Sequence, residues 1–240
     1  MDQLTDLKQT ALQSGATFFG VADLAPAYEL IFSQGGERIA AFPRALSIGI
    51  ELQHHLVDPL PNQDDLAVVI SYRHHAYDVI NQRLDHITSL LSGKIQAWGY
   101  KTCPVPASQT VDYQRNIGIF SNKLAASLAG LGWIGKSCLL VTPAAGPRVR
   151  WATVLTTAPF AASGTMLEQR CGECRECVDI CPAQAFSGTS FNPAEAREVR
   201  FATHKCRAHL NAREEQTGFS VCGLCLYVCP HGRKAAQKLS

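Results

Sequence analysis

CGECRECVDICP, the stretch from Cys171 to Pro182, places four cysteines at the spacing C-x2-C-x2-C-x3-C and ends on proline. This is the spacing of bacterial ferredoxins, in which three thiolates bind one [4Fe–4S] cluster and the fourth ligates a second cluster. Short loops between the first three cysteines let their sulfurs converge on one cluster, and the proline then redirects the chain. The stretch therefore predicts a ferredoxin-like module in the C-terminal part of the chain.

A second motif, CGLCLYVCP, runs from Cys222 to Pro230 and lacks the middle cysteine of the full spacing. Cys206, which lies sixteen residues upstream, is the most economical replacement. The alternative is a pair of structural zinc sites, but zinc motifs need neither the third closely spaced cysteine nor the C-P ending. Crossing the ligands over completes two [4Fe–4S] sets, with Cys171, Cys174, Cys177 and Cys229 for the first cluster and Cys206, Cys222, Cys225 and Cys181 for the second.

The composition is that of a protein with a substantial core, because hydrophobic residues make up 46% and charged residues 18% of the 240. The formal net charge of +2 is too small a bias to argue for nucleic-acid binding. The N-terminus has no signal-peptide pattern, and no apolar run is long enough to span a membrane, so we expect a cytoplasmic protein without membrane contact. Two cysteines belong to neither ligand set, and we expect Cys103 and Cys138 to be buried, inert thiols.

The rest of the chain predicts an α+β protein with two domains. Residues 1–160 alternate between helical and strand patterns, whereas residues 161–240 contain the cysteine module, after a join rich in small and polar residues. A helical stripe runs from residue 66 to residue 98, and residues 100–105 are expected to be extended because of two prolines. We expect residues 138–141 and 149–155 to form a strand pair around the turn at 143–147.

A glycine-rich run, NKLAASLAGLGWIGK from Asn122 to Lys136, resembles the signature of the epoxyqueuosine reductases, which also precedes a double-cluster module in that family. The resemblance covers about residues 100–232. It implies a nitroreductase-like N-terminal domain that binds cobalamin, with one cluster against the corrinoid, as in the reductive dehalogenases. It also implies a corrinoid site that includes the turn residues Gly130, Gly132, Trp133, Gly135 and Lys136. From the sequence alone, a plain helix-to-strand connection is the favoured explanation of the glycines.

The chain departs from this family at the expected proton donor. Epoxyqueuosine reductases have an aspartate fourteen residues before the first glycine of the GLGW run, and here that position is Asn116. An amide cannot act as a general acid near neutral pH. Asp112 and Tyr113 lie close by and are candidates for the missing role. The helical-repeat extension that helps full-length enzymes hold tRNA is also missing, so both departures argue against a tRNA substrate.

Three functions remain open. The first is an enzyme, an epoxyqueuosine reductase-like oxidoreductase that passes electrons from two [4Fe–4S] clusters to cobalamin, which reduces a small or modified-nucleoside substrate. The second is a corrinoid-free electron-transfer protein that serves a partner enzyme, and the third is a redox sensor. In the first two we expect a low-potential donor such as a ferredoxin or flavodoxin. The acceptor, whether a small molecule or a protein, is not identified by the sequence.

Overall fold

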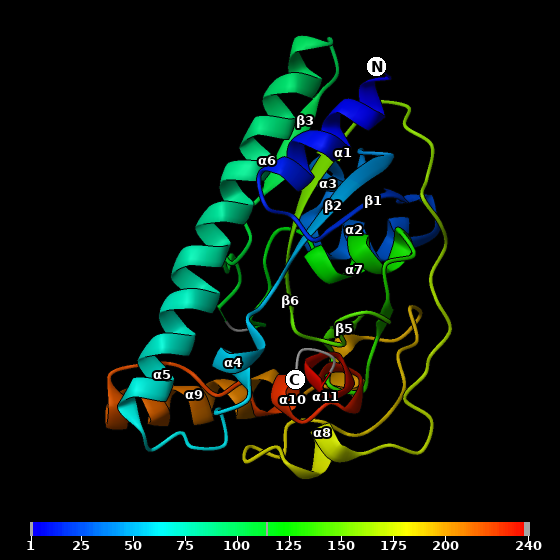
Figure 1. Cartoon of the computed structure of the whole chain (residues 1–240). Coiled ribbons are helices and arrows are strands. Elements are labelled where there is room, and N and C mark those ends of the chain that lie inside the picture. Colours follow the sequence, from blue (N-terminus) through cyan, green and yellow to red (C-terminus); the bar gives the residue numbers. More distant parts are fainter. Residues whose placement is uncertain (1, 114, 238–240) are drawn as a thin grey trace.

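The structure is a computed structural model, and it describes residues 2–113 and 115–237. Its centre is a four-stranded sheet of order β1-β2-β6-β3 in which every neighbouring pair is antiparallel. The sheet, together with helices on both faces, makes this a mixed α and β fold (Figure 1). The strands are β1 (Phe18–Asp23), β2 (Arg44–Glu51), β3 (Thr102–Val105) and β6 (Val149–Thr156).

One face of the sheet is covered by a long helical rod and by α1 (Gln3–Gln13), as Figure 1 shows. The rod consists of α5 (Leu66–Arg73), a π-helical turn η2 (His74–Val79) and α6 (Ile80–Ala97). This confirms the helical stripe expected from the sequence, because its apolar residues are buried against the sheet. The buried stripe of α6 is Ile80, Leu84, Ile87, Leu91 and Ile95.

The other face is covered by shorter helices. α7 (Asn122–Leu128) packs on the sheet, and Ser121 caps it by accepting a hydrogen bond from the Leu124 N–H. α2 (Tyr28–Gly35) and α3 (Glu37–Ala40) contribute to the same buried cluster, which is separate from the cluster on the α6 face. No helix in the described part of the chain has the length and apolar character needed to cross a membrane.

The expected pairing of residues 138–141 with residues 149–155 is wrong. β5 (Leu140–Val141) pairs with β4 (Trp133–Ile134), whereas β6 lies between β2 and β3 in the main sheet. The turn between the two segments does form, because Thr142 and Gly146 exchange backbone hydrogen bonds. β5 therefore folds back on the glycine-rich turn, and β6 enters the main sheet.

The C-terminal segment is built of short helices and loops at one end of the rod (Figure 1). Val221 and Leu226 belong to the same buried cluster as the sheet and rod residues, so the segment packs directly on the rest of the chain. An added Cβ on Gly223 would be 2.9 Å from Leu60 Cδ1, just before the rod, and 3.4 Å from the Tyr72 hydroxyl in α5. The helices are α8 (Glu176–Asp179), η3 (Arg197–Val199), α9 (Thr203–Thr217), α10 (Leu224–Tyr227) and α11 (Pro230–Ala236), and the remaining short helices of the chain are η1 (Ala25–Ala27) and α4 (His54–Val57).

A buried arginine joins this segment to the sheet. Arg148, just before β6, is fully buried, and its guanidinium forms an ion pair with Asp58 at 2.7 Å. It also contacts His54 Nδ1 at 3.0 Å and donates to the Tyr227 carbonyl at 3.5 Å. The chain passes very close at this point, since a Cβ on Gly146 would lie 2.2 Å from the Gly232 nitrogen. Gly146 also has a φ of 59°, a conformation that glycine adopts without strain.

Replacing Gly146 by alanine should therefore destabilise the protein. The alanine costs about 1 kcal/mol or more for the left-handed conformation, and its Cβ displaces the backbone of α11 as well. We expect the midpoint of thermal unfolding, followed by circular dichroism without oxygen, to fall by several degrees.

Gly93→Ala is the matched control. Gly93 lies inside α6 with no atom within 4 Å of an added Cβ. Alanine there should stabilise the helix by about 0.5–1 kcal/mol. Equal shifts of the unfolding midpoint in the two variants would contradict the close approach of the chain at Gly146.

Candidate functional site

The structure brings the first set of cysteines together around one cavity. Cys171, Cys174, Cys177 and Cys229 line a space of about 130 Å³. Burial raises the pKa of Cys177 to about 12, and thiolate repulsion from Cys171, Cys229 and Cys174 contributes to the rise. The backbone N–H groups of His231 and Gly232 face Cys229 and lower the pKa of its thiol, although burial raises it overall. Four convergent thiols with N–H donors fit an iron–sulfur cluster, whose iron binds thiolates and releases their protons.

The second set is gathered where α9, α10 and the loop after α8 meet. Burial and the thiolates of Cys222 and Cys181 raise the pKa of Cys206 to about 11. Burial raises the pKa of Cys225 strongly, with further contributions from Cys222, Cys206 and Cys181. The weakest contribution at Cys225 comes from Cys177 of the first set, so the two sets are neighbours. Cys206, which stands outside both compact motifs, is therefore close to the other three residues assigned with it.

The two remaining cysteines differ from these. Cys138 is 4% exposed and has a φ of 55°, and burial raises the pKa of its thiol. Cys103 is partly buried and packs against the apolar cluster below α7. Cys138 is therefore buried as expected but has Lys123, Arg197 and Arg200 nearby, whereas Cys103 has apolar neighbours and is only partly buried.

The glycine-rich turn lies against the cysteine module. An added Cβ on Gly135 would be 3.5 Å from Cys171 Sγ, and Gly132 abuts the Val141 backbone. Lys136 donates to the carbonyl oxygens of Gly172 at 2.6 Å and Cys174 at 3.3 Å.

The other two residues of the turn are also enclosed by nearby chain. Gly130 faces the backbone of Gly164 and Thr165, and Trp133 is buried edge-on to His231. Of the five residues expected to form a corrinoid site, Gly135 and Lys136 line the space between the cysteines of the first set. None of the five is among the described residues that line the large cavity.

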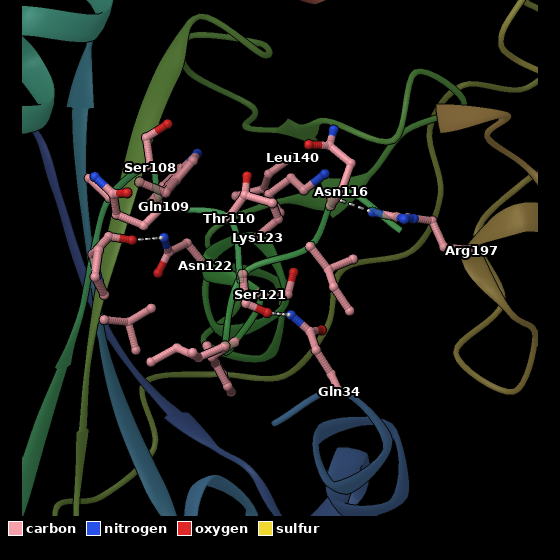
Figure 2. Close-up of a pocket in the computed structure, with 18 of the residues that line it drawn as sticks. Gln34, Ser108, Gln109, Thr110, Asn116, Ser121, Asn122, Lys123, Leu140 and Arg197 are labelled. Carbon is pink, nitrogen blue, oxygen red and sulfur yellow. Dashed lines mark hydrogen bonds between the residues drawn. The ribbon is translucent and has the colours of Figure 1, made fainter. Parts of the chain in front are cut away.

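The large cavity has a volume of about 620 Å³ and lies between the loop at 105–121, the start of β6 and the segment around η3 (Figure 2). This volume is within the range of about 300–1,000 Å³ that is typical of cofactor and substrate sites. Leu226, which follows Cys225 directly, contributes to its wall. The second cysteine set is therefore next to the large cavity. Its apolar lining consists mainly of Leu30, Val105, Ile117, Ile119, Phe120, Leu139, Leu140, Val149, Trp151 and Leu226.

Of the three expected catalytic residues, the structure places only Asn116 in the lining of this cavity. Tyr113 is 78% exposed, and the Asp112 carboxylate accepts a hydrogen bond from the Arg115 N–H at 2.9 Å. Asn116 has a φ of 53°.

Two arginines fix Asn116. Its Oδ1 accepts from Arg207 at 2.6 Å, and its carbonyl oxygen accepts from Arg197 at 3.2 Å, a contact drawn in Figure 2. Arg207 follows Cys206 on α9, so the cavity loop is connected to the helix that carries a cysteine of the second set.

Lys123 is a site residue that the sequence analysis did not single out. It lines the large cavity and donates to the Cys138 carbonyl oxygen. Burial lowers the pKa of its amine, and the nearby Arg197 and Arg200 lower it further, while Cys138 and Cys225 oppose the shift. It stands in the first turn of an apolar helix, where a solvated lysine is the ordinary interpretation, and only its tertiary neighbours reveal the burial.

Comparison with known proteins bears on the cysteine module first. Residues 170–232 match the 4Fe-4S double cluster binding domain. The chain carries a double-cluster iron–sulfur domain. The zinc alternative is therefore set aside, and the module supports two [4Fe–4S] clusters.

The same comparison finds relatives named epoxyqueuosine reductase. One, from Bacillus anthracis, is 38% identical over 68 residues, covering 28% of this chain and 18% of the relative. Another, from Synechococcus sp. strain RCC307, is 27% identical over 269 residues, covering 96% of this chain and 76% of the relative. Only a fifth or less of the first relative's length is matched.

A solved structure shows a similar fold. The structure of a reductive dehalogenase, which suggests a mechanism for B12-dependent dehalogenation by that protein, matches with a TM-score of 0.65 and 18% identity. The match covers 98% of this chain and 33% of the dehalogenase chain. At this identity the match establishes the shared fold, and it extends over both the sheet and the cysteine module.

Two clusters per chain predict about eight iron and eight sulfide after preparation without oxygen. Cys206→Ala should lower both to about four and leave one electron-paramagnetic signal recognisable. Cys103→Ala, which removes a cysteine far from both sets in the sequence, is the control and should keep the full content. Survival of both clusters in Cys206→Ala would show that the crossed ligand sets are wrong.

Proposed function

We propose that the chain is a reductase in which two [4Fe–4S] clusters pass electrons to a cobalamin in the large cavity. Cys171, Cys174, Cys177 and Cys229 would hold the first cluster, and Cys206, Cys222, Cys225 and Cys181 the second. Residues 1–160 would form a nitroreductase-like corrinoid domain and residues 161–240 the ferredoxin-like module. A low-potential donor such as a ferredoxin or flavodoxin would supply the electrons.

The observation that carries this proposal is the position of Leu226. This residue follows Cys225 and lines the cavity, so the second cluster would be separated from a bound group by little more than one side chain. Cys174 of the first set is exposed, whereas Cys225 of the second set is partly buried. Electrons would therefore enter at the first cluster, cross to the second, and leave through the wall of the cavity.

The cavity residues fit a corrinoid in chemistry, and the volume of about 620 Å³ would hold part of the cofactor. The walls of the cavity are largely apolar, and two buried donors, Trp151 Nε1 and Arg197 Nε, have no partner among the described residues. Such donors suit the amide carbonyls at the edge of a corrin ring. When bound, cobalamin supplies a low-potential cobalt centre that reduces a small or modified-nucleoside substrate. The glycine-rich turn would support the first cluster rather than the corrinoid, which alters the role that the family resemblance implies.

Binding of cobalamin can be tested with variants that differ only in where bulk is added. Gln109 lines the cavity, and Gln96 lies on the exposed side of α6. Cluster-loaded protein should change the absorption spectrum of added cobalamin and co-elute with it in gel filtration. Gln109→Trp should weaken binding at least about tenfold by filling the cavity, and Gln96→Trp should not.

Failure of the unsubstituted, cluster-loaded chain to bind cobalamin would contradict the proposal. The corrinoid-free electron-transfer protein would then be the better description, because it requires the clusters and a donor only.

The contacts of Asn116 also determine the pKa that a carboxyl group introduced at this position would have. In Asn116→Asp the new carboxylate would face Arg207, and an opposite charge at that distance lowers a carboxyl pKa. The new carboxyl group would then be ionised near neutral pH and would be a poor proton donor. We expect little turnover of epoxyqueuosine in tRNA by the unsubstituted chain, and little gain in the single variant.

Removing the arginine as well should change this result. Asn116→Asp combined with Arg207→Gln leaves the carboxyl without its ion pair, and a general acid contributes about a hundred- to ten-thousand-fold. Arg207→Gln alone is the control, because it lacks the acid. The comparison is made by measuring queuosine formation, and high activity of the unsubstituted chain would show that Asn116 does not limit the reaction.

A further inference from the structure

The charges that line the large cavity are unbalanced. Its described lining includes the cations Arg115, Lys123, Arg150 and Arg197, and a single acidic residue, Glu198. Glu198 already forms an ion pair with Arg197, with Nη2 and Oε1 3.2 Å apart. The described lining therefore keeps an excess of positive charge.

Two of these cations have only neutral partners. Lys123 donates to a backbone carbonyl and forms no ion pair with a carboxylate of the described residues. Arg150 donates from Nε and Nη2 to the Asn81 amide oxygen at 3.1 and 3.0 Å, and its guanidinium lies 4.4 Å from the Tyr77 ring centroid. Both side chains are partly buried. Withdrawing a charge from water without a counter-ion is costly, so the two residues favour an anion in the cavity.

Trp151 contributes its ring to the wall of the same cavity. Its side chain is 6% exposed, and the face of its six-membered ring packs against Gly49, where an added Cβ would be 2.6 Å from Cζ3. The indole is therefore held firmly and belongs to the apolar part of the enclosure.

We propose that the substrate of the cavity is a small amphipathic anion, an apolar or aromatic body that carries a carboxylate or phosphate. Lys123 binds the acidic group, and the apolar walls, which include the Trp151 ring, enclose its body. This substrate class rests on the proposed function, since it describes what a corrinoid in the same cavity would reduce. It differs from the tRNA-borne nucleoside that the relatives' name implies.

A charged and a neutral ligand of the same shape test this assignment directly. Benzoate and benzamide are titrated calorimetrically into cluster-loaded protein without corrinoid, with phenyl phosphate as a second anion. The clusters carry the same charge in every titration, so the preference for benzoate over benzamide is measured with that charge already present. We expect benzoate to bind at least about tenfold more tightly than benzamide, because a charge-assisted hydrogen bond is the stronger one.

Substitutions assign the preference to Lys123. Lys123→Gln should abolish it, Lys123→Arg should retain most of it, and Lys101→Gln, at an exposed lysine outside the cavity lining, should leave it unchanged. Iron content and circular dichroism establish that each variant is folded and loaded. Equal binding of benzoate and benzamide, or an unchanged preference in Lys123→Gln, would overturn the proposal.

A competition experiment separates substrate from cofactor. Cobalamin carries a phosphate in its nucleotide loop, and cobinamide does not. Displacement of benzoate by cobalamin but not by cobinamide would assign the anion site to the cofactor and overturn the substrate proposal. Simultaneous binding of benzoate and cobalamin supports it. A benzoate preference in a chain that fails to bind cobalamin would refute the corrinoid proposal alone.

Discussion

The ion pair of Arg148 is the interaction on which the arrangement of the module and the cavity depends. A fully buried guanidinium is costly unless its donors are paired, and here Asp58, His54 and the Tyr227 carbonyl pair its two terminal nitrogens, while Nε has no partner among the described residues. His54 begins α4, Asp58 follows its end, and Tyr227 ends α10, which leads to Cys229. One side chain thus connects the sheet, the segment before the rod and the helix that precedes Cys229.

The same strand continues from this anchor into the large cavity. Val149, Arg150 and Trp151 follow Arg148 and contribute to the cavity lining, while Leu226 of the cysteine module forms another part of it. A change that moved α10 would therefore move the cavity wall and the second cysteine set together. The module is held in place for this coupling because Val221 and Leu226 belong to the same buried cluster as the rod residues.

Sequence patterns predicted the features that depend on near neighbours. The cysteine spacing and the stripe of α6 are local, because each repeats within a few residues. The pairing of β5 was mistaken because a strand of two residues carries no register signal and its partner β4 is equally short. Gly135 was correctly placed in a turn, but its contact with Cys171 is a tertiary one. Arg148 could be interpreted as a surface charge, since its partner Tyr227 is 79 residues away.

The charge of Lys123 links the second cluster to the large cavity. Burial lowers the pKa of the Lys123 amine, and the nearby Arg197 and Arg200 lower it further. An anionic cluster near Cys225 acts in the opposite direction, and so does an anion in the cavity. Reduction adds a negative charge to a cluster, so it would strengthen the hold of Lys123 on its proton. Because the same amine would bind a substrate anion, the charge of the second cluster and the occupancy of the cavity are thermodynamically linked. Each must alter the other's equilibrium by the same free energy.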